Sequence, residues 1–226
     1  SDGPLFDANS GLSPLPATTL DEMTTGYIFY TSGTTGRPKG AMLTHGNMVH
    51  SAMTFIHLMA LGPRDRFAVV VPLSHISGSV AVLATAVAAG GALIILDSFD
   101  AADFLTVAAR ERMTHSVLVP TMYNLCLMRA DFAGYDLSAW RTAGYGGAPM
   151  PEVTIERLTE RLPAVGLYNL YGATETTSAI TFLFPQDACA RRDTVGQAAV
   201  GVDIRVMDPA GREVEAGAIG ELWIGG

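Results

Sequence analysis

Short apolar runs alternate along this chain with longer amphipathic runs. The short runs are rich in β-branched and aromatic residues and predict buried strands, whereas the long runs carry apolar residues at helical spacing. Strands that alternate with helices predict βαβ units around a mainly parallel sheet. The expected fold class is therefore α/β, with a mainly parallel sheet flanked by helices. The expected strands are Gly26–Thr31, Arg66–Val71, Ala92–Leu96, His115–Val119, Arg141–Gly146 and Ala164–Gly172, and the expected helices are residues 44–61, 76–89, 101–112 and 151–162, with one more that Pro120 opens.

Two segments carry boundary signals. Thr44 is a good N-cap residue, and Gly62-Pro63 closes the helix that follows it after about Leu61. The apolar segment Ile76–Leu96 is long enough to resemble a membrane span. Gly90-Gly91 divides it, however, and no basic residues flank it, so a buried helix, a tight turn and a buried strand fit better.

The pattern changes after about Arg192. Two short strand-like runs surround the turn "DPAG" at Asp208–Gly211, with no helix between them. This arrangement predicts the start of an antiparallel β unit. We expect an irregular lead-in at 1–25, an α/β unit at 26–191 and the beginning of a β unit at 192–226.

Composition narrows the class of protein. The 226 residues are 49% hydrophobic, enough for a substantial core, and their net charge of −8 without a basic run argues against nucleic acid as the main partner. The two cysteines, Cys126 and Cys189, lie far apart without metal-ligand spacing and suit a reducing cytoplasm. Residues 1–16 lack the basic and apolar regions of a signal peptide. We expect a cytoplasmic protein without a membrane span.

The segment "YTSGTTGRPKGAMLTHGN", Tyr30–Asn47, concentrates glycine and hydroxyl residues around one lysine. Glycine lets backbone N–H groups converge on an anion, and hydroxyls and Lys39 add donors and charge, which together describe a polyphosphate cradle. It is not a Walker loop, because Pro38 stands where the second glycine belongs and Gly40 follows Lys39. By composition alone, a surface hairpin stays an alternative.

Five segments in order closely resemble motifs of the adenylate-forming enzymes, the superfamily of acyl-CoA synthetases, aryl-CoA ligases, luciferases and peptide-synthetase adenylation domains. The resemblance runs from about Gly26 to the end of the chain. One departure is Ser74, where the family usually has an aromatic residue before the histidine. The resemblance therefore does not establish which side chain forms that wall of the pocket. The segments are "YTSGTTGRPKG" (Tyr30–Gly40), "PLSHISG" (Pro72–Gly78), "YGGAP" (Tyr145–Pro149), "NLYGATET" (Asn169–Thr176) and "GELWIGG" (Gly220–Gly226).

The resemblance implies ATP, Mg²⁺ and coenzyme A, or a carrier-protein thiol in its place. A carboxylate would attack the α-phosphate of ATP, and a thiol would then displace AMP from the acyl adenylate. The implied nucleotide-binding residues are Thr31, Ser32, Gly33, Thr34, Thr35, Gly36, Lys39, Gly146, Gly147, Ala148, Tyr171, Gly172 and Thr174, and the implied catalytic residues are Lys39, His75, Thr174 and Glu175.

Glu175 is the expected Mg²⁺ ligand. It follows a predicted buried strand, where α/β folds place ligand-binding groups, and one carboxylate is enough for a metal that keeps waters and phosphate oxygens. The resemblance makes His75 a gate between the acid pocket and the thiol tunnel, although a structural histidine is an alternative. Lys39 could equally be a solvated loop lysine, and Tyr171 a core tyrosine. His50 and His57 share a helix face, but no third metal ligand is evident.

The lack of an acidic residue after the segment "PLSHISG" narrows the class of substrate. Adenylation domains for α-amino acids usually place an aspartate soon after the segment that corresponds to "PLSHISG", and the stretch here, Ser74–Gly91, contains no acidic residue. An ammonium group in that apolar pocket would lack a partner. We therefore expect a fatty or aryl acid without an α-amine.

The family's Thr-Gly-Asp segment, its hinge and its lysine-bearing C-terminal domain do not follow Gly226, and the start of its large domain does not precede Ser1. We expect a fragment of a longer AMP-forming acyl-CoA synthetase that is itself a poor catalyst. The alternatives are an acyl-AMP ligase or adenylation domain that loads a carrier protein, and a nucleotide-binding module without catalysis.

Overall fold

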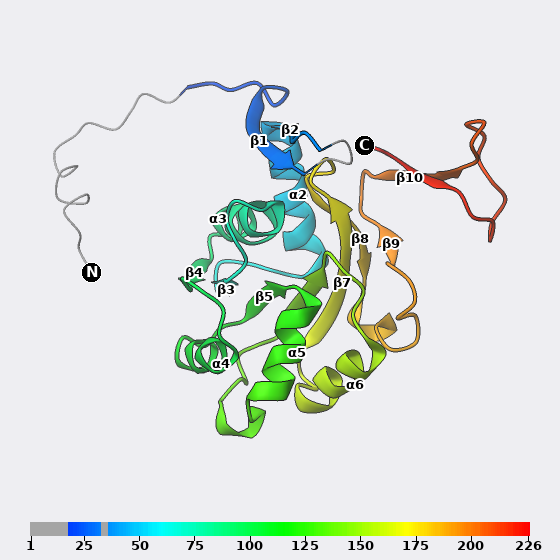
Figure 1. The fold of residues 1–226 in the computed structure, drawn as a ribbon. Coiled ribbons are helices and arrows are strands. Elements are labelled where there is room, and N and C mark those ends of the chain that lie inside the picture. The colour runs from blue at the N-terminus through cyan, green and yellow to red at the C-terminus, as the bar shows by residue number, and fades with distance from the viewer. Residues whose placement is uncertain (1–17, 33–35) are drawn as a thin grey trace.

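The computed structural model describes residues 18–32 and 36–226, and its centre is a seven-stranded sheet (Figure 1). The strands lie in the order β4-β3-β5-β6-β7-β8-β9. The first five strands of this order run parallel to one another, whereas β8 is antiparallel to both β7 and β9. The predicted α/β class with a mainly parallel sheet is confirmed. The strands are β3 (Arg66–Val69), β4 (Ala92–Ile95), β5 (His115–Leu118), β6 (Thr142–Gly146), β7 (Gly166–Ala173), β8 (Ser178–Leu183) and β9 (Gln197–Ala198).

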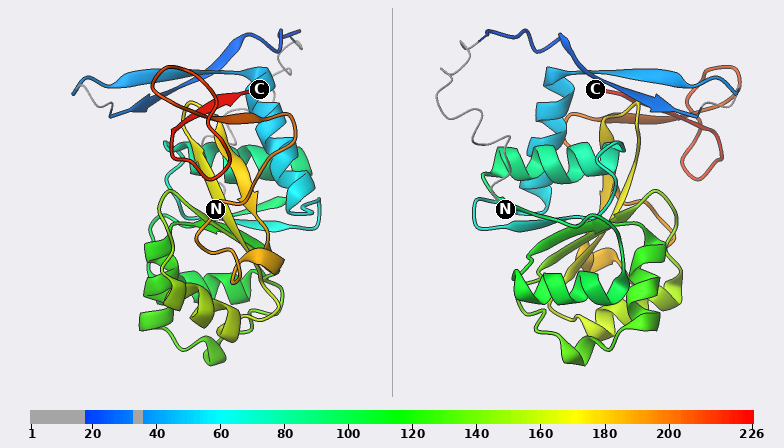
Figure 2. Two further views of the ribbon diagram at one scale, coloured as in Figure 1. Left: turned by 90° about the vertical axis from the view of Figure 1, so that its right-hand side faces the viewer. Right: turned by 60° about the vertical axis from the view of Figure 1, so that its left-hand side comes forward.

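Helices cover both faces of this sheet. Figures 1 and 2 show α2 and α3 on one side and α4, α5 and α6 on the other. Each side has its own apolar core, one around Phe104 and Trp140 and the other around Phe55 and Phe182. The helices are α2 (His45–Leu58), the π-helix η1 (Ser77–Ala84), α3 (Thr85–Ala89), α4 (Ala101–Arg110), α5 (Pro120–Arg129) and α6 (Glu152–Arg161), with short 3₁₀ turns η2 (Phe132–Gly134) and η3 (Pro185–Asp187).

Helix α2 begins where the sequence predicts. The Thr44 hydroxyl accepts a hydrogen bond from the Asn47 N–H, and the Asn47 side chain accepts one from the Thr44 N–H, which completes a capping box. The expected end near Leu61 is wrong by three residues. The helix ends at Leu58 because Ala60 adopts a left-handed φ of 49°, which turns the chain out of the helix.

The long apolar segment is divided as the sequence predicts. The π-helix η1 continues into α3, and Gly90, with φ of 69°, ends the helical run before strand β4. A side chain at Gly91 would meet the ring of Phe67 and the backbone of Asp65, so the turn needs glycine at this close approach. Within 18–32 and 36–226, no helix has both the length and the apolar character that crossing a membrane requires.

Two small antiparallel sheets lie at the same end of the molecule (Figure 2). The first pairs β1 (Thr25–Thr31) with β2 (Lys39–Thr44), and β2 leads directly into α2. The second pairs β10 (Asp203–Met207) with β11 (Glu221–Gly225), which confirms the predicted antiparallel unit. The large sheet reaches β9, past Arg192, before this second unit begins.

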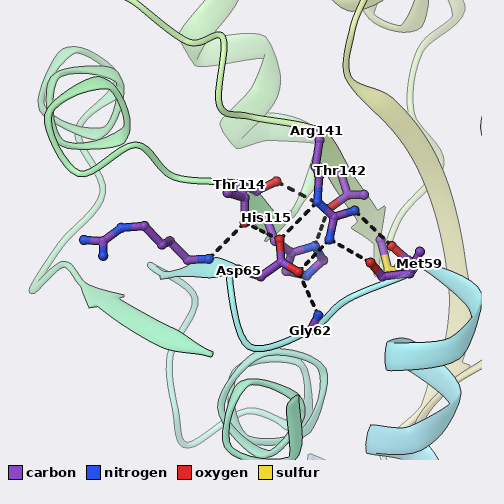
Figure 3. Close-up of polar contacts among 9 residues, drawn as sticks. Met59, Gly62, Asp65, Thr114, His115, Arg141 and Thr142 are labelled. Carbon is purple, nitrogen blue, oxygen red and sulfur yellow. Dashed lines mark hydrogen bonds and ion pairs between the residues drawn. The ribbon is translucent and has the colours of Figure 1, made fainter. Parts of the chain in front are cut away.

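A polar cluster lies at the amino ends of the parallel strands (Figure 3). The Asp65 carboxylate accepts hydrogen bonds from Arg141, from the Thr114 hydroxyl at 2.6 Å and from the Gly62 N–H at 2.7 Å. Burial opposes the ionisation of Asp65, but these donors outweigh it and lower the pKa of its carboxyl. The cluster therefore joins the loop after α2 to the starts of β3, β5 and β6.

Candidate active site

A cavity of about 390 Å³ lies at the opposite edge of the sheet, at the carboxyl ends of the parallel strands. This edge is where open α/β sheets bind ligands, because the loops that leave parallel strands gather there. Val71 and Pro72 follow β3, and Val119 follows β5. The cavity is lined by Phe55, Val71, Pro72, His75, Ile76, Ser77, Ala81, Val117, Leu118, Val119, Gly146, Gly147, Leu170, Gly172, Ala173, Thr174, Ser178 and Ala179.

Five predicted site residues meet at this cavity, although they come from three separate motifs. They are His75, Gly146, Gly147, Gly172 and Thr174. The motifs follow β3, end β6 and end β7, so it is the parallel order of these strands that brings them together.

The two glycines after β6 keep one wall of the cavity free of side chains. A Cβ at Gly146 would overlap the Leu170 carbonyl oxygen of the neighbouring strand, so the position has no room for one. Gly147 has φ of 79°, which L residues adopt only with strain. A flat group can therefore lie against backbone here. Ala148, expected beside them, is exposed and does not line the cavity.

The turn between β7 and β8 separates two predicted residues. Thr174 lines the first cavity, whereas Glu175 lines a second cavity of about 510 Å³ on the other side of the turn. The second cavity lies between the start of α2, this turn and the end of β11. Its lining residues are Glu22, Met23, Thr44, Gly46, Asn47, His50, Ser51, Glu175, Thr176, Thr177, Ile180, Gly201, Val202, Ile224, Gly225 and Gly226.

His75 lies in the loop between β3 and η1. Its backbone N–H donates to the Pro72 carbonyl at 3.0 Å, and its own carbonyl accepts from the Ser79 N–H at 3.0 Å. The imidazole is exposed at the rim of the first cavity. It can therefore meet a group that enters the cavity from solvent.

The Gly-rich segment forms the tip of the β1–β2 hairpin. Thr31 pairs with Lys39 at its base, and Gly36 has φ of 76°, with no described residue apart from its chain neighbours within 4 Å of where a Cβ would lie. Gly33, Thr34 and Thr35 lie outside the described residues. Of the predicted phosphate-binding residues that are described, the loop members Thr31, Ser32, Gly36 and Lys39 line neither cavity.

Tyr171, expected near the adenine, is 39% exposed and does not line either cavity. Tyr145, which directly precedes Gly146, is buried in the core around Phe104 and Trp140, and burial raises the pKa of its hydroxyl to about 12. Tyr145 therefore stays neutral and serves packing.

Sequence reasoning missed part of the wall. Phe55 reaches the first cavity from α2, and Ser178 and Ala179 reach it from β8, a strand absent from the sequence prediction. The run "SAITFL" that forms β8 carried a usable signal, because it is apolar and β-branched.

Metal chemistry has few donors to draw on. Within 18–32 and 36–226, no three His, Cys, Asp or Glu side chains lie close enough to hold a metal ion between them. A metal ion at this site would therefore need oxygen atoms from water or from a bound ligand in addition to protein side chains. Glu175 offers one exposed carboxylate that could bind it.

The fold and its cavity define a ligand-binding α/β protein, and comparison with known proteins makes the class specific. The AMP-binding enzyme family matches residues 3–226, so this chain belongs to that family. Among its relatives, the indoleacetate–CoA ligase of Aromatoleum aromaticum is 34% identical over 199 residues. That match covers 88% of this chain and 39% of the relative.

Solved structures agree with this assignment. The N-terminal domain of FACL13 from Mycobacterium tuberculosis has a TM-score of 0.85 at 29% identity, over 92% of this chain and 52% of that one. The o-succinylbenzoate coenzyme A synthetase MenE from Bacillus subtilis, in complex with ATP and magnesium ion, has a TM-score of 0.84 at 27% identity, over 98% and 46%. The chain thus spans well under two thirds of the relatives that it matches.

Proposed function

We propose that this chain is the nucleotide- and acid-binding part of a longer AMP-forming acid–thiol ligase. The observation that carries the proposal is the cavity at the carboxyl ends of β3, β5, β6 and β7, where His75, the two glycines after β6, and Thr174 meet. Of the similar proteins named above, one is a coenzyme A ligase by name and another a coenzyme A synthetase, and the synthetase was solved with ATP and magnesium ion. Both facts support the proposal.

In the first half-reaction, a substrate carboxylate oxygen attacks the α-phosphorus of ATP. The bond from that phosphorus to the bridging oxygen breaks, pyrophosphate leaves, and an acyl adenylate forms. The Gly146-Gly147 wall would accept the flat adenine or acyl group, and Thr174 would donate a hydrogen bond toward the α-phosphate. Lys39 and the hydroxyls of the β1–β2 tip would bind the β- and γ-phosphates.

Glu175 would bind Mg²⁺ that arrives with ATP. The donor set fits, because one exposed carboxylate suffices for a hard cation that keeps waters and phosphate oxygens. The metal would neutralise phosphate charge. Thr174 lines the first cavity and Glu175 lines the second, on the other side of the turn. The phosphates of a nucleotide that contacts both residues would therefore extend across this turn.

In the second half-reaction, a thiol sulfur attacks the acyl carbon and AMP leaves, which gives the thioester. His75, exposed at the rim of the first cavity, would lie where the thiol enters. We propose coenzyme A as the thiol and a cytoplasmic location, with a carrier-protein thiol as the alternative acceptor.

The substrate would be a fatty or aryl acid without an α-amine. Of the described residues that line the first cavity, none is Asp or Glu, and most are apolar. A substrate ammonium bound there would lose its water without gaining a charged partner, which is costly.

The test compares two acids with the same skeleton. The full-length ligase that contains this segment is assayed for acyl-adenylate formation with 3-phenylpropanoate and with phenylalanine, which differ in the α-ammonium group. We expect 3-phenylpropanoate, or another fatty or aryl acid without an α-amine, to react and phenylalanine to fail. A preference for phenylalanine would contradict the proposal. Thioester formation with free coenzyme A then separates this function from an exclusive carrier-protein ligase.

A further inference from the structure

The turn that carries Thr174 and Glu175 has an unusual backbone. Thr177 and Ser178, consecutive and neither of them glycine, have φ of 56° and 95°. L residues avoid this region because Cβ crowds the backbone, and β-branched threonine avoids it most. Such a conformation persists only when its surroundings hold it.

Hydrogen bonds of Thr176 and Thr177 within the turn help to hold it. The Thr177 N–H donates to the Thr174 carbonyl at 3.1 Å. The Thr176 hydroxyl accepts from the Ala173 N–H at 2.8 Å, and its one proton lies within reach of the Ala173 carbonyl at 3.0 Å or the Ser178 carbonyl at 2.9 Å. These contacts close the turn but do not fix it against the rest of the protein.

A contact from outside the turn comes from α2. The Ser51 hydroxyl donates to the Thr177 carbonyl at 2.6 Å, across 126 residues of sequence. Ser51 is 5% exposed and Thr177 is 4% exposed, so water has little access to this bond. Removal of the donor would leave a buried carbonyl without this partner, which costs more than the loss of an exposed hydrogen bond.

Helix α2 is well placed to hold the turn in position. Phe55, one helical turn beyond Ser51, packs edge-on against Phe182 of β8 with ring centroids 5.4 Å apart. Both rings are fully buried. At its other end, α2 follows directly on β2, which begins at Lys39 beside the Gly-rich tip. One rigid helix thus joins the two segments to which we assign phosphate and metal binding.

We infer that Ser51 is a positioning residue, which holds the turn of Thr174–Thr177 in the conformation that presents Thr174 and Glu175 to their two cavities. It does not touch the ligand's reacting atoms. It acts through the Thr177 carbonyl. The structural part of this inference stands on the contacts above, and its consequence for catalysis rests on the proposed function.

The first experiment measures amide hydrogen exchange in the 226-residue chain. Ser51→Ala is compared with Thr54→Ala, which removes another buried hydroxyl from the same helix. We expect exchange in peptides that cover Gly172–Ala179 to rise about tenfold in Ser51→Ala and to stay near wild type in Thr54→Ala. No rise, a rise spread evenly over the chain, or an equal rise in Thr54→Ala would overturn the inference.

Ser51→Cys covers the case in which Ser51→Ala does not fold. The thiol has a similar size but is a weak donor, so a smaller rise confined to the same peptides is expected. Unchanged exchange in a folded Ser51→Cys protein would overturn the inference.

The second experiment measures acid-dependent pyrophosphate exchange in the full-length ligase as Mg²⁺ is titrated. In Ser51→Ala, the Mg²⁺ concentration for half-maximal rate should rise several-fold, while the KM for the acid stays near wild type. A purely structural role would lower the rate without moving the Mg²⁺ requirement, and that result would overturn the inference. If the wild-type ligase shows no exchange, the proposed function fails, and hydrogen exchange alone then decides the role of Ser51.

Discussion

Asp65 and Arg141 form an ion pair at the amino ends of the parallel strands, although 76 residues separate them in the sequence. The guanidinium donates to both carboxylate oxygens, at 3.1 and 2.6 Å, and also to the Ala60 carbonyl at 2.8 Å (Figure 3). Asp65 is nearly buried, with 7% of its side chain exposed, whereas Arg141 is 39% exposed. The pair therefore clamps the end of the sheet that faces away from the cavity.

The first prediction tests this clamp. Arg141→Met should lower the free energy of unfolding by about 2–4 kcal/mol, because it leaves a nearly buried carboxylate without its charged partner. Urea unfolding of the 226-residue chain measures the loss. The control, Arg212→Met, removes an exposed partner of Asp208 and should change stability little. Equal effects of the two changes would show that the pair is no clamp.

The second prediction concerns His115, which is fully buried beside this pair. Its Nδ1 lies 2.8 Å from the Thr142 hydroxyl, and its Nε2 has no hydrogen-bond partner among the described residues. Burial lowers the pKa of this imidazole to about 3, and nearby Asp65 opposes that shift only in part. Between pH 6.5 and 3 the unfolded chain therefore binds a proton that the folded chain does not. Stability should fall as the pH drops below 6.5, by about 1.4 kcal/mol per pH unit from this group.

Urea unfolding at pH 7, 6 and 5 checks the His115 prediction. His115→Phe keeps a ring of similar shape and should reduce the loss of stability on acidification. His57→Gln, a change at an exposed histidine, should leave the loss as in wild type. A pH dependence that survives His115→Phe unaltered would rule His115 out as its source.

Local signals explain what the sequence could predict. Thr44 and Asn47 mark the start of α2, and Gly90 marks the end of α3, because caps depend on residues close in sequence. The parallel direction of β3, β5, β6 and β7 was predicted from the alternation of strands and helices, whereas their order in the sheet was not predicted. The parallel arrangement brings three motifs to one cavity, although helices and loops separate these motifs in the chain.

Most of the misses depend on contacts that no local pattern carries, and β8 is the exception, because its own apolar and β-branched residues gave a strand signal. Strand β2 lies in a segment rich in glycine and reads as a loop, and it is a strand because it pairs with β1. Strand β8 turns back on β7 through four residues, which only an antiparallel pair allows. Thr174 and Glu175 line different cavities, and Thr177 and Ser178 in the same turn adopt positive φ values, for which their residue types give no warning.

The third prediction concerns Gly172, at the end of β7. A Cβ there would overlap the Ser178 carbonyl oxygen across the hairpin. Gly172→Ala should therefore destabilise the chain by about 1–3 kcal/mol and disturb the turn that follows. Gly134→Ala, where a Cβ would meet nothing within 4 Å, is the control and should stay within about 0.5 kcal/mol of wild type. Thermal unfolding compares the two, and indistinguishable curves would contradict the close approach.

The fourth prediction separates the metal ligand from ordinary surface charge. In the full-length ligase, Glu175→Gln should abolish most acid-dependent pyrophosphate exchange, because the amide binds Mg²⁺ far more weakly than the carboxylate. Glu215→Gln removes an exposed carboxylate outside both cavities and should leave the rate unchanged. Undiminished exchange in Glu175→Gln would refute the metal assignment.

The most direct test of the proposed function is the exchange of labelled pyrophosphate into ATP by the full-length ligase, with and without an amine-free carboxylic acid. In the proposed reaction, acyl-adenylate formation is reversible, so the label should enter ATP only when a suitable acid is present. The 226-residue chain alone, which spans 39% of the indoleacetate–CoA ligase, should bind Mg·ATP weakly and exchange little or none. Exchange that does not depend on any acid, or none from the full-length ligase across fatty and aryl acids, would contradict the assignment of acid activation to this site.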